Sequence, residues 1–166
     1  KILNDPEKPV QIIFSGKAHP KDEQGKALIA EINSFTMDEE LRNKILFIDN
    51  YNIYVARYLV QGCDIWLNNP RRPQEASGTS GMKVIANGGL NFSILDGWWA
   101  EAYTPENGWK IDTITDESMP VEQRDAYEAE SLYSVLENEI IPLYYKRDKQ
   151  GVPREWVAKI RNSIEN

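Results

Sequence analysis

The sequence predicts an α/β fold of the Rossmann-like type, and two observations support this class. Apolar segments of strand length alternate with helical segments along the chain, which is the pattern of a parallel sheet connected by helices. The strand segments are continuous apolar runs, as expected for strands whose two faces are both covered. At 166 residues the chain is long enough for one domain and too short for two. We therefore expect a single three-layer α/β/α domain over residues 1–166.

Each element follows from its local pattern. Four apolar runs predict strands, at residues 10–18, 44–49, 63–68 and 90–95, and a short fifth strand is expected around Trp109. Helical spacing of apolar residues predicts helices at 19–35, 52–62, 82–89, 121–145 and 153–164. The longest helix places one apolar stripe on a single face: Leu132, Leu136, Ile140 and Leu143. The segment that begins at Trp98 is expected to be an active loop.

Composition excludes several classes of function. The net charge of −7 argues against nucleic acid and anionic membranes, since both repel an acidic surface. The single cysteine, Cys63, cannot form an internal disulfide, so we expect a reducing, cytoplasmic setting. The apolar runs are shorter than a membrane helix needs, and no His, Cys, Asp or Glu spacing indicates a metal site. The chain begins in mid-pattern without Met, which is typical of a piece of a larger protein.

Polar motifs follow the ends of four predicted strands. They read "SGKAHP", "DNYN", "NNPRRPQEASG" and "LDGWW". Ligands of open parallel sheets bind beyond the carboxyl ends of the strands. The four motifs are therefore predicted to gather on one rim and to form a binding cleft.

The stretch "EASGTSGMK", Glu75 to Lys83, carries the chemistry of this predicted rim. Ser77 or Thr79 is expected to cap the following helix, whose first amides form an anion site. Thr79 and Lys83 are four residues apart and share a helix face, so a phosphate and an aldehyde of one small molecule can reach both. Apolar neighbours such as Met82 and Val84, with the strand at 90–95, are expected to desolvate the lysine. From spacing alone, an ordinary capped helix with a solvated lysine is the better interpretation, because the motif lacks the pattern of a P-loop.

A resemblance over a longer stretch of sequence favours the ligand site over the solvated lysine. The run "NNPRRPQEASGTSGMKVIANGGLNFSILDGWWAEAY" closely resembles the α-glucan phosphorylases, the glycogen, starch and maltodextrin enzymes, in their shorter bacterial and archaeal form. The resemblance continues through "PVQIIFSGKAHPKDEQGK", "FIDNYNIYVARYLVQG", "AESLYSVLENEIIPLYY" and "GVPREWV", and so covers nearly the whole chain. It implies the carboxy-terminal half of a two-domain glycosyltransferase of the GT-B type.

The resemblance also implies roles for individual residues. Lys83 would carry pyridoxal 5′-phosphate as a Schiff base, while Thr79 and Ser80 bind the cofactor phosphate. Tyr51 would approach the cofactor. Two positions of the glycine turn, Ser77 and Gly78, would line the sugar site, and Gly78 would also border the cofactor. Glu75 would hold hydroxyls of the glucosyl unit, which makes Glu75 and Lys83 the candidate catalytic pair.

The implied reaction is reversible phosphorolysis of α-1,4-glucan or maltodextrin. Inorganic phosphate attacks a terminal glucosyl unit, and glucose 1-phosphate leaves with retention. The cofactor phosphate assists proton transfer to the substrate phosphate, which is sound chemistry for two phosphates that share a proton.

This sequence differs from the family pattern in two ways that affect the implied function. Asn52 stands where the long mammalian-type enzymes carry an arginine that reaches the cofactor phosphate. A basic segment for the substrate phosphate would lie before Lys1, and the amino-terminal domain that closes the cleft is missing. We therefore expect this fragment to be folded but inactive alone, and the sequence leaves its cofactor occupancy open.

Two other functions are weighed against this one. A sugar-nucleotide-dependent glucan synthase of the same architecture would carry a second glutamate at the position of Lys83. A non-catalytic carbohydrate-binding domain would not need the intact motif. Nearby, Asp96 either forms a turn or orients the sugar site, and Trp98 and Trp99 either stack on sugar rings or pack in the core. Arg71 and Arg72 are interpreted as surface charges or salt-bridge partners.

Overall fold

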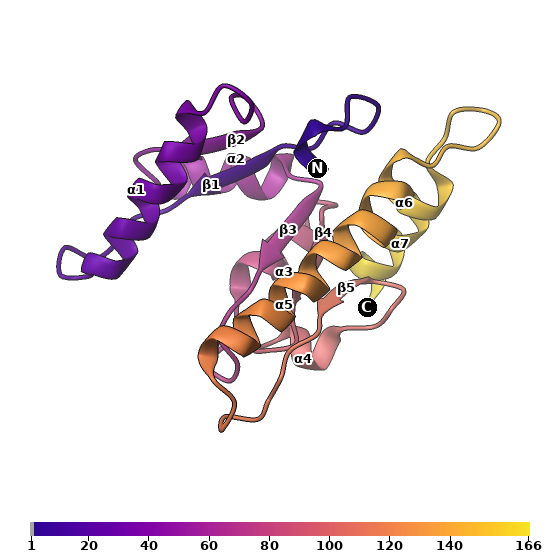
Figure 1. Cartoon of the computed structure of the whole chain (residues 1–166). Helices are drawn as coiled ribbons and strands as arrows, with labels where there is room; N and C mark the ends of the chain where they lie inside the picture. Colours follow the sequence, from indigo (N-terminus) through magenta and orange to yellow (C-terminus); the bar gives the residue numbers. More distant parts are fainter. Residues whose placement is uncertain (1) are drawn as a thin grey trace. The chain divides into compact units, whose positions relative to one another are not determined.

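The chain forms parallel sheets flanked by helices, which confirms the predicted α/β class (Figure 1). The computed structural model describes residues 2–166, which divide into two compact units, one up to Ala56 and one from Arg57 to Asn166. The five strands fall into two sheets, of order β1-β2 and β3-β4-β5, where we expected one. The sequence pattern identifies strands but not their pairing, and the expectation of a single domain stays a prediction.

The unit up to Ala56 holds a two-stranded sheet. Its elements are η1 (Ile2–Asn4), β1 (Ile12–Ser15), α1 (Glu23–Met37) and β2 (Ile45–Ile48), with Ile12 paired to Ile45 and Phe14 to Phe47. Asp22 begins α1, because its side chain accepts a hydrogen bond of 2.8 Å from the Gly25 amide. The prediction that β1 is fully buried is wrong within the described chain: Ile13 and Phe14 are 47% and 37% exposed.

A three-stranded sheet forms the second unit around the central strand β4. The division between the units falls within α2 (Ile53–Gly62), and β3 (Ile65–Asn68), α3 (Thr79–Ile85), β4 (Leu90–Ile94), α4 (Trp99–Ala102) and β5 (Gly108–Ile111) follow. Phe92 of β4 pairs with Leu67 of β3 and with Trp109 of β5. All five residues of β4 are buried, including the polar Asn91 and Ser93, as expected for a central strand whose two faces are both covered.

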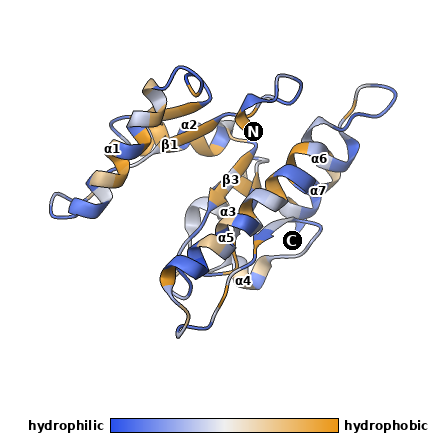
Figure 2. Ribbon diagram, viewed as in Figure 1, coloured by the Kyte–Doolittle hydropathy of each residue, from blue (hydrophilic) through white to orange (hydrophobic). Residues whose placement is uncertain are grey.

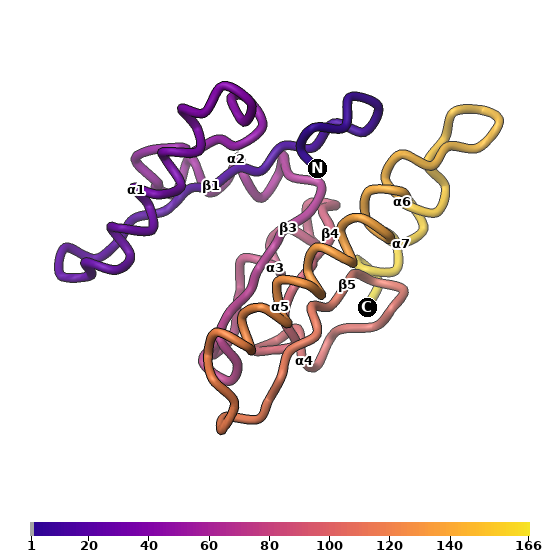
Figure 3. Tube along the Cα trace, viewed as in Figure 1, coloured from indigo at the N-terminus to yellow at the C-terminus, as the bar shows by residue number. Residues whose placement is uncertain are grey.

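One face of this sheet is covered by the carboxy-terminal helices. They are α5 (Val121–Val135), η2 (Leu136–Ile140), α6 (Ile141–Tyr145) and α7 (Arg154–Glu165). Figure 3 shows that α5 and α6 follow one continuous coil, within which η2 is a π-helical turn before Pro142. The predicted stripe is confirmed: Ile140 is buried with Leu90, Phe92 and Ile94, and Leu132, Leu136 and Leu143 pack against the same core.

The opposite face is covered by α3 and α4. Side chains alternate along a strand, so Asn91 and Ser93 point away from the core formed by Leu90, Phe92 and Ile94. Asn91 lies against Gly81 of α3. The segment after Trp98, which was expected to be an active loop, begins with the short helix α4. This helix buries Trp99, whose indole N–H donates to the Trp109 carbonyl at 3.1 Å.

Hydropathy follows this arrangement. Figure 2 shows hydrophobic colour along β1 and β3 and mixed colour along the helices. No helix within residues 2–166 combines the length and the apolar character that crossing a bilayer requires.

Candidate functional site

The segments that follow β3 and β4 meet at one edge of the three-stranded sheet. Parallel neighbouring strands end at the same edge, which places the turn containing Glu75 beside the turn containing Asp96. The Glu75 amide donates to Asp96 Oδ2 at 2.9 Å, and the Trp98 amide donates to the Ser77 carbonyl at 2.9 Å. The gathering of polar motifs is thus confirmed for these two loops. The other two motifs belong to the first unit, and their predicted gathering on this rim stays a prediction.

Two glycines allow this close approach. Gly97 adopts φ +53°, and a Cβ placed on it would stand 2.5 Å from the Ser77 carbonyl oxygen and 3.1 Å from Cγ of Glu75. Gly78 adopts φ +80°, and its own Cβ would stand 3.6 Å from the carboxyl carbon of Glu75. Side chains other than glycine rarely adopt such angles. The Glu75 side chain therefore lies over two backbone positions that are kept bare.

Helix α3 begins at Thr79, immediately after Gly78. The prediction that Ser77 or Thr79 caps it is wrong, because Gly78 occupies the cap position in a left-handed conformation and no side chain caps the helix. Its first amides have no acceptor one turn earlier within the helix, as at every helix start. Gly81 packs α3 onto the sheet: a Cβ there would stand 2.8 Å from Asn91 Oδ1 and 3.1 Å from the Trp98 ring. Asn91 Oδ1 is buried without a hydrogen-bond partner.

Thr79 and Lys83 lie on the exposed side of α3, one turn apart, as the spacing predicts. The expectation that Met82, Val84 and strand β4 enclose the lysine is wrong for the described residues. Val84 is buried and faces the sheet, while Lys83 and Met82 are exposed, because successive residues of a helix are turned by about 100°. The amine of Lys83 is thus open to a ligand that approaches from outside this unit.

Asp96 and the two tryptophans resolve alternatives that the sequence left open. Asp96 is only 9% exposed, and its second oxygen, Oδ1, accepts from the Gly97 amide at 3.0 Å. It therefore forms a turn and also holds the Glu75 backbone. Trp99 is a core residue, 1% exposed, while the partly buried Trp98 covers Gly78 and Gly81. The one sequence signal for the Asp96 contact was its place beside Gly97 at a strand end.

Tyr51 and Asn52 belong to the first unit, and Tyr51 is partly buried there. Asn52 is engaged locally. Its Oδ1 accepts from the Tyr54 and Val55 amides at 2.9 and 3.1 Å, and its Nδ2 donates to the Asn50 carbonyl at 3.0 Å. These contacts cap the start of α2. The asparagine at this position thus starts a helix, a role that the sequence pattern does not indicate.

An ion pair ties the loop before Glu75 to α5. The two terminal guanidinium nitrogens of Arg71 donate to the carboxylate of Asp125, at 2.8 and 2.9 Å, as the interpretation of Arg71 as a salt-bridge residue anticipated. The hydrogen bonds lower the pKa of Asp125 and raise that of Arg71. Both side chains are about half exposed, so the pair contributes little to stability.

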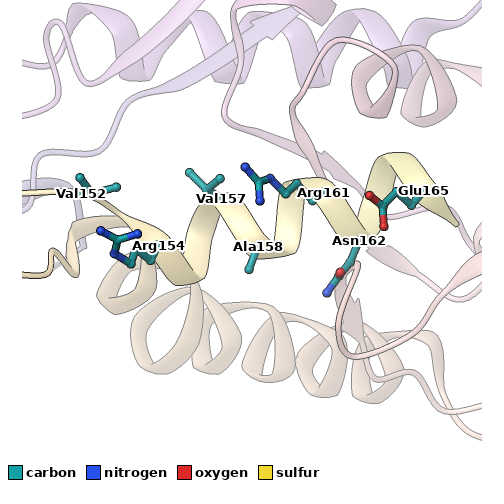
Figure 4. A pocket seen from close by; sticks show the side chains of 7 residues that line it. All are labelled: Val152, Arg154, Val157, Ala158, Arg161, Asn162 and Glu165. Atoms are coloured by element: carbon teal, nitrogen blue, oxygen red, sulfur yellow. The ribbon is translucent and has the colours of Figure 1, made fainter.

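A hollow along α7 is lined by none of these residues. Figure 4 shows its side chains, which come from α7 and the preceding turn and include Val157 and Arg161. None of them belongs to the predicted site. Within residues 2–166, no group of three or more His, Cys, Asp or Glu side chains is arranged to hold a metal ion.

Known proteins resemble this chain over its full length. A family profile described as carbohydrate phosphorylase matches residues 2–138. Glycogen phosphorylase of Aquifex aeolicus is 49% identical over 100% of the chain and 23% of its own length. Maltodextrin phosphorylase of Thermococcus litoralis and glycogen phosphorylase of Mycobacterium tuberculosis are each 48% identical, over 100% and 99% of the chain and 19% of their own lengths. The chain therefore spans about a fifth of the length of these relatives.

Proposed function

Because the chain belongs to the carbohydrate phosphorylase family, we propose that it is the part of an α-glucan phosphorylase that holds pyridoxal 5′-phosphate and the glucosyl unit. One observation carries this proposal. The segment from Glu75 to Lys83 lies within the matched region, at the carboxyl edge of the sheet, and its loop is fixed by Asp96 and Trp98. Sites of α/β folds occupy this edge.

The residues present fit this cofactor. A phosphate needs hydrogen-bond donors, and the start of α3 offers backbone amides with the hydroxyls of Thr79 and Ser80. An aldehyde needs a primary amine, and exposed Lys83 supplies one a helical turn from Thr79. Gly78 adopts φ +80°, which allows the tight turn that leads from Glu75 into α3.

Each residue then has a proposed role. Lys83 would hold the cofactor covalently through its amine, Thr79 and Ser80 would bind its phosphate, and Gly78 would border it. Tyr51 of the first unit would contribute a further contact to the cofactor. Asn52 is neutral, and its side chain caps the start of α2. The charge of the cofactor phosphate must therefore be balanced by a cationic group elsewhere.

In the proposed reaction, an oxygen of inorganic phosphate bonds to C1 of the terminal glucosyl unit as the α-1,4 bond breaks. The departing glycosidic oxygen takes a proton from the inorganic phosphate, and glucose 1-phosphate is released with retention. When bound, the cofactor supplies a phosphate that assists this proton transfer. Glu75 orients hydroxyls of the sugar, and the backbone at Ser77 and Gly78 lines the space for the ring. Binding that fixes the sugar in this way is worth large rate factors.

The cofactor assignment is tested by chemical trapping in the complete native polypeptide that contains this chain. The protein is incubated with pyridoxal 5′-phosphate, reduced with borohydride and digested, and the pyridoxyl mass is mapped. We expect the label on Lys83 and its loss in Lys83→Arg, with Lys26→Arg on α1 as the matched control. Label on another lysine, or none, contradicts the assignment.

The reaction itself is tested by phosphorolysis of maltodextrin. We expect glucose 1-phosphate from the complete polypeptide and none from residues 1–166 alone, since the relatives are about five times longer. Activity of the 166-residue chain, purified from a host that lacks its own phosphorylase, would overturn the proposed inactivity of the part.

A further inference from the structure

We propose that Asp96 is a positioning residue for the sugar site, which acts by holding the backbone of Glu75. The inference rests on the proposed function, because it concerns the loop that would bind the glucosyl unit. Asp96 is buried, whereas Glu75 follows four exposed residues, from Arg71 to Gln74. The attachment of this loop to the sheet therefore depends on few contacts, and the Asp96 carboxylate makes one of them.

The two oxygens of Asp96 have separate partners. Oδ2 accepts from the Glu75 amide at 2.9 Å, 21 residues away in the chain, and Oδ1 accepts from the Gly97 amide at 3.0 Å. The first bond holds the backbone of Glu75, and the second fixes the carboxylate itself. An ionised carboxylate accepts through both oxygens, and such charge-assisted bonds are stronger than neutral ones.

The hydrogen bond between the Glu75 amide and Asp96 fixes the direction in which the Glu75 side chain points. Holding the amide of residue 75 fixes the start of a short turn, and the Trp98 amide fixes its other end by donating to the Ser77 carbonyl at 2.9 Å. Between these two points, Cγ of Glu75 packs against the bare backbone of Gly97. Loss of the first bond releases one end of the turn while the second stays in place.

Asp96→Asn is the sharpest variant for this test. Asparagine keeps the size of the side chain but has one acceptor oxygen, so an NH₂ group must face one of the two amides. In the complete native polypeptide we expect kcat/KM for maltodextrin to fall about 10- to 100-fold, the range for displacement of a positioned group. Pyridoxal trapped on Lys83 is expected to stay unchanged. Asp112→Asn, which breaks the exposed pair with Lys110, is the matched control and is expected to keep full activity.

A double-mutant cycle separates positioning of Glu75 from a general structural role. If Asp96 acts through Glu75, Asp96→Asn costs less than about 3-fold when Glu75 is already alanine, since coupled residues are not additive. Equal factors in both backgrounds contradict the inference. Unchanged kinetics in Asp96→Asn overturn it while leaving phosphorolysis intact.

Hydrogen exchange resolved to single amides tests the contact without reference to activity. In the wild-type polypeptide, the Glu75 amide is expected to exchange roughly 10- to 100-fold more slowly than the amide of exposed Ala76. In Asp96→Asn this protection is lost, whereas that of β4 amides remains. An unprotected Glu75 amide in the wild type overturns the inference even if the variant does not fold. A wild type that protects Glu75 but produces no glucose 1-phosphate refutes the proposed function alone.

Discussion

In the unit from Arg57 to Asn166, every residue of the central strand β4 is buried, whereas no described residue of the unit up to Ala56 is. β4 has a strand on each side and helices against both faces. β1 has a single neighbouring strand in its sheet. Loops that carry function need a rigid support. The contrast indicates that the Glu75–Lys83 segment is positioned by the second unit, through β3 and β4.

The largest difference in stability between the two units should come from a matched pair of core substitutions. Phe92→Ala in β4 is expected to lower the free energy of unfolding by about 3–5 kcal/mol, because it leaves a cavity in a closed core. Phe14→Ala in β1 is expected to cost roughly 1–2 kcal/mol, since that side chain is partly exposed already. Urea denaturation followed by circular dichroism measures both. Equal costs would mean that the two sheets are covered alike.

Glycine substitutions should give the next largest difference. Gly97→Ala is expected to cost roughly 2–4 kcal/mol, from its positive φ and from the clash with the Ser77 carbonyl. Gly88→Ala shares the positive φ but has open space around it, and so should cost about 1–2 kcal/mol. In the first unit, Gly16→Ala meets no atom within 4 Å and should be near neutral. Thermal unfolding ranks the three, and a Gly97 cost no greater than that of Gly88 argues against close contact between the two loops.

Ion pairs should give the smallest effect. Asp125→Asn removes the bidentate pair with Arg71 and is expected to cost about 0.2–1 kcal/mol at pH 7, as for exposed pairs. The folded-state pKa of Asp125 is lowered, so this stability is present above the ordinary aspartate pKa and is lost as pH falls through the folded value. The mutant and wild type should therefore converge in acid.

An ion pair within α1 of the first unit is compared with the Arg71–Asp125 pair of the second unit. Glu23→Gln breaks the Lys26–Glu23 pair three residues apart in α1, which should matter by a few tenths of a kcal/mol. Urea midpoints between pH 2 and 7 check both substitutions. A mutant of Asp125 that stays destabilised in acid would show that the side chain has a role besides its charge.

The sequence predicted the elements well because their patterns are local. Four apolar runs and the segment around Trp109 located the strands of the described residues, and helical spacing identified the stripe that includes Leu132 and Ile140. Prediction from the sequence failed where a tertiary contact determines the local structure or the strand pairing. Helix α4 forms because Trp99 is buried against β5, and the distribution of strands over two sheets depends on pairing that no local pattern encodes.

For the candidate site, the sequence by itself determined which residue types stand together: a carboxylate, two glycines, three hydroxyls and an amine within Glu75–Lys83. Helix periodicity placed Thr79 and Lys83 on one face. Only the tertiary structure decided that Gly78 precedes the helix in place of a side-chain cap, that Lys83 is exposed, and that Asp96 holds Glu75. The last contact joins residues 21 apart because parallel strands β3 and β4 end at the same edge, and that adjacency exists only once the sheet has formed.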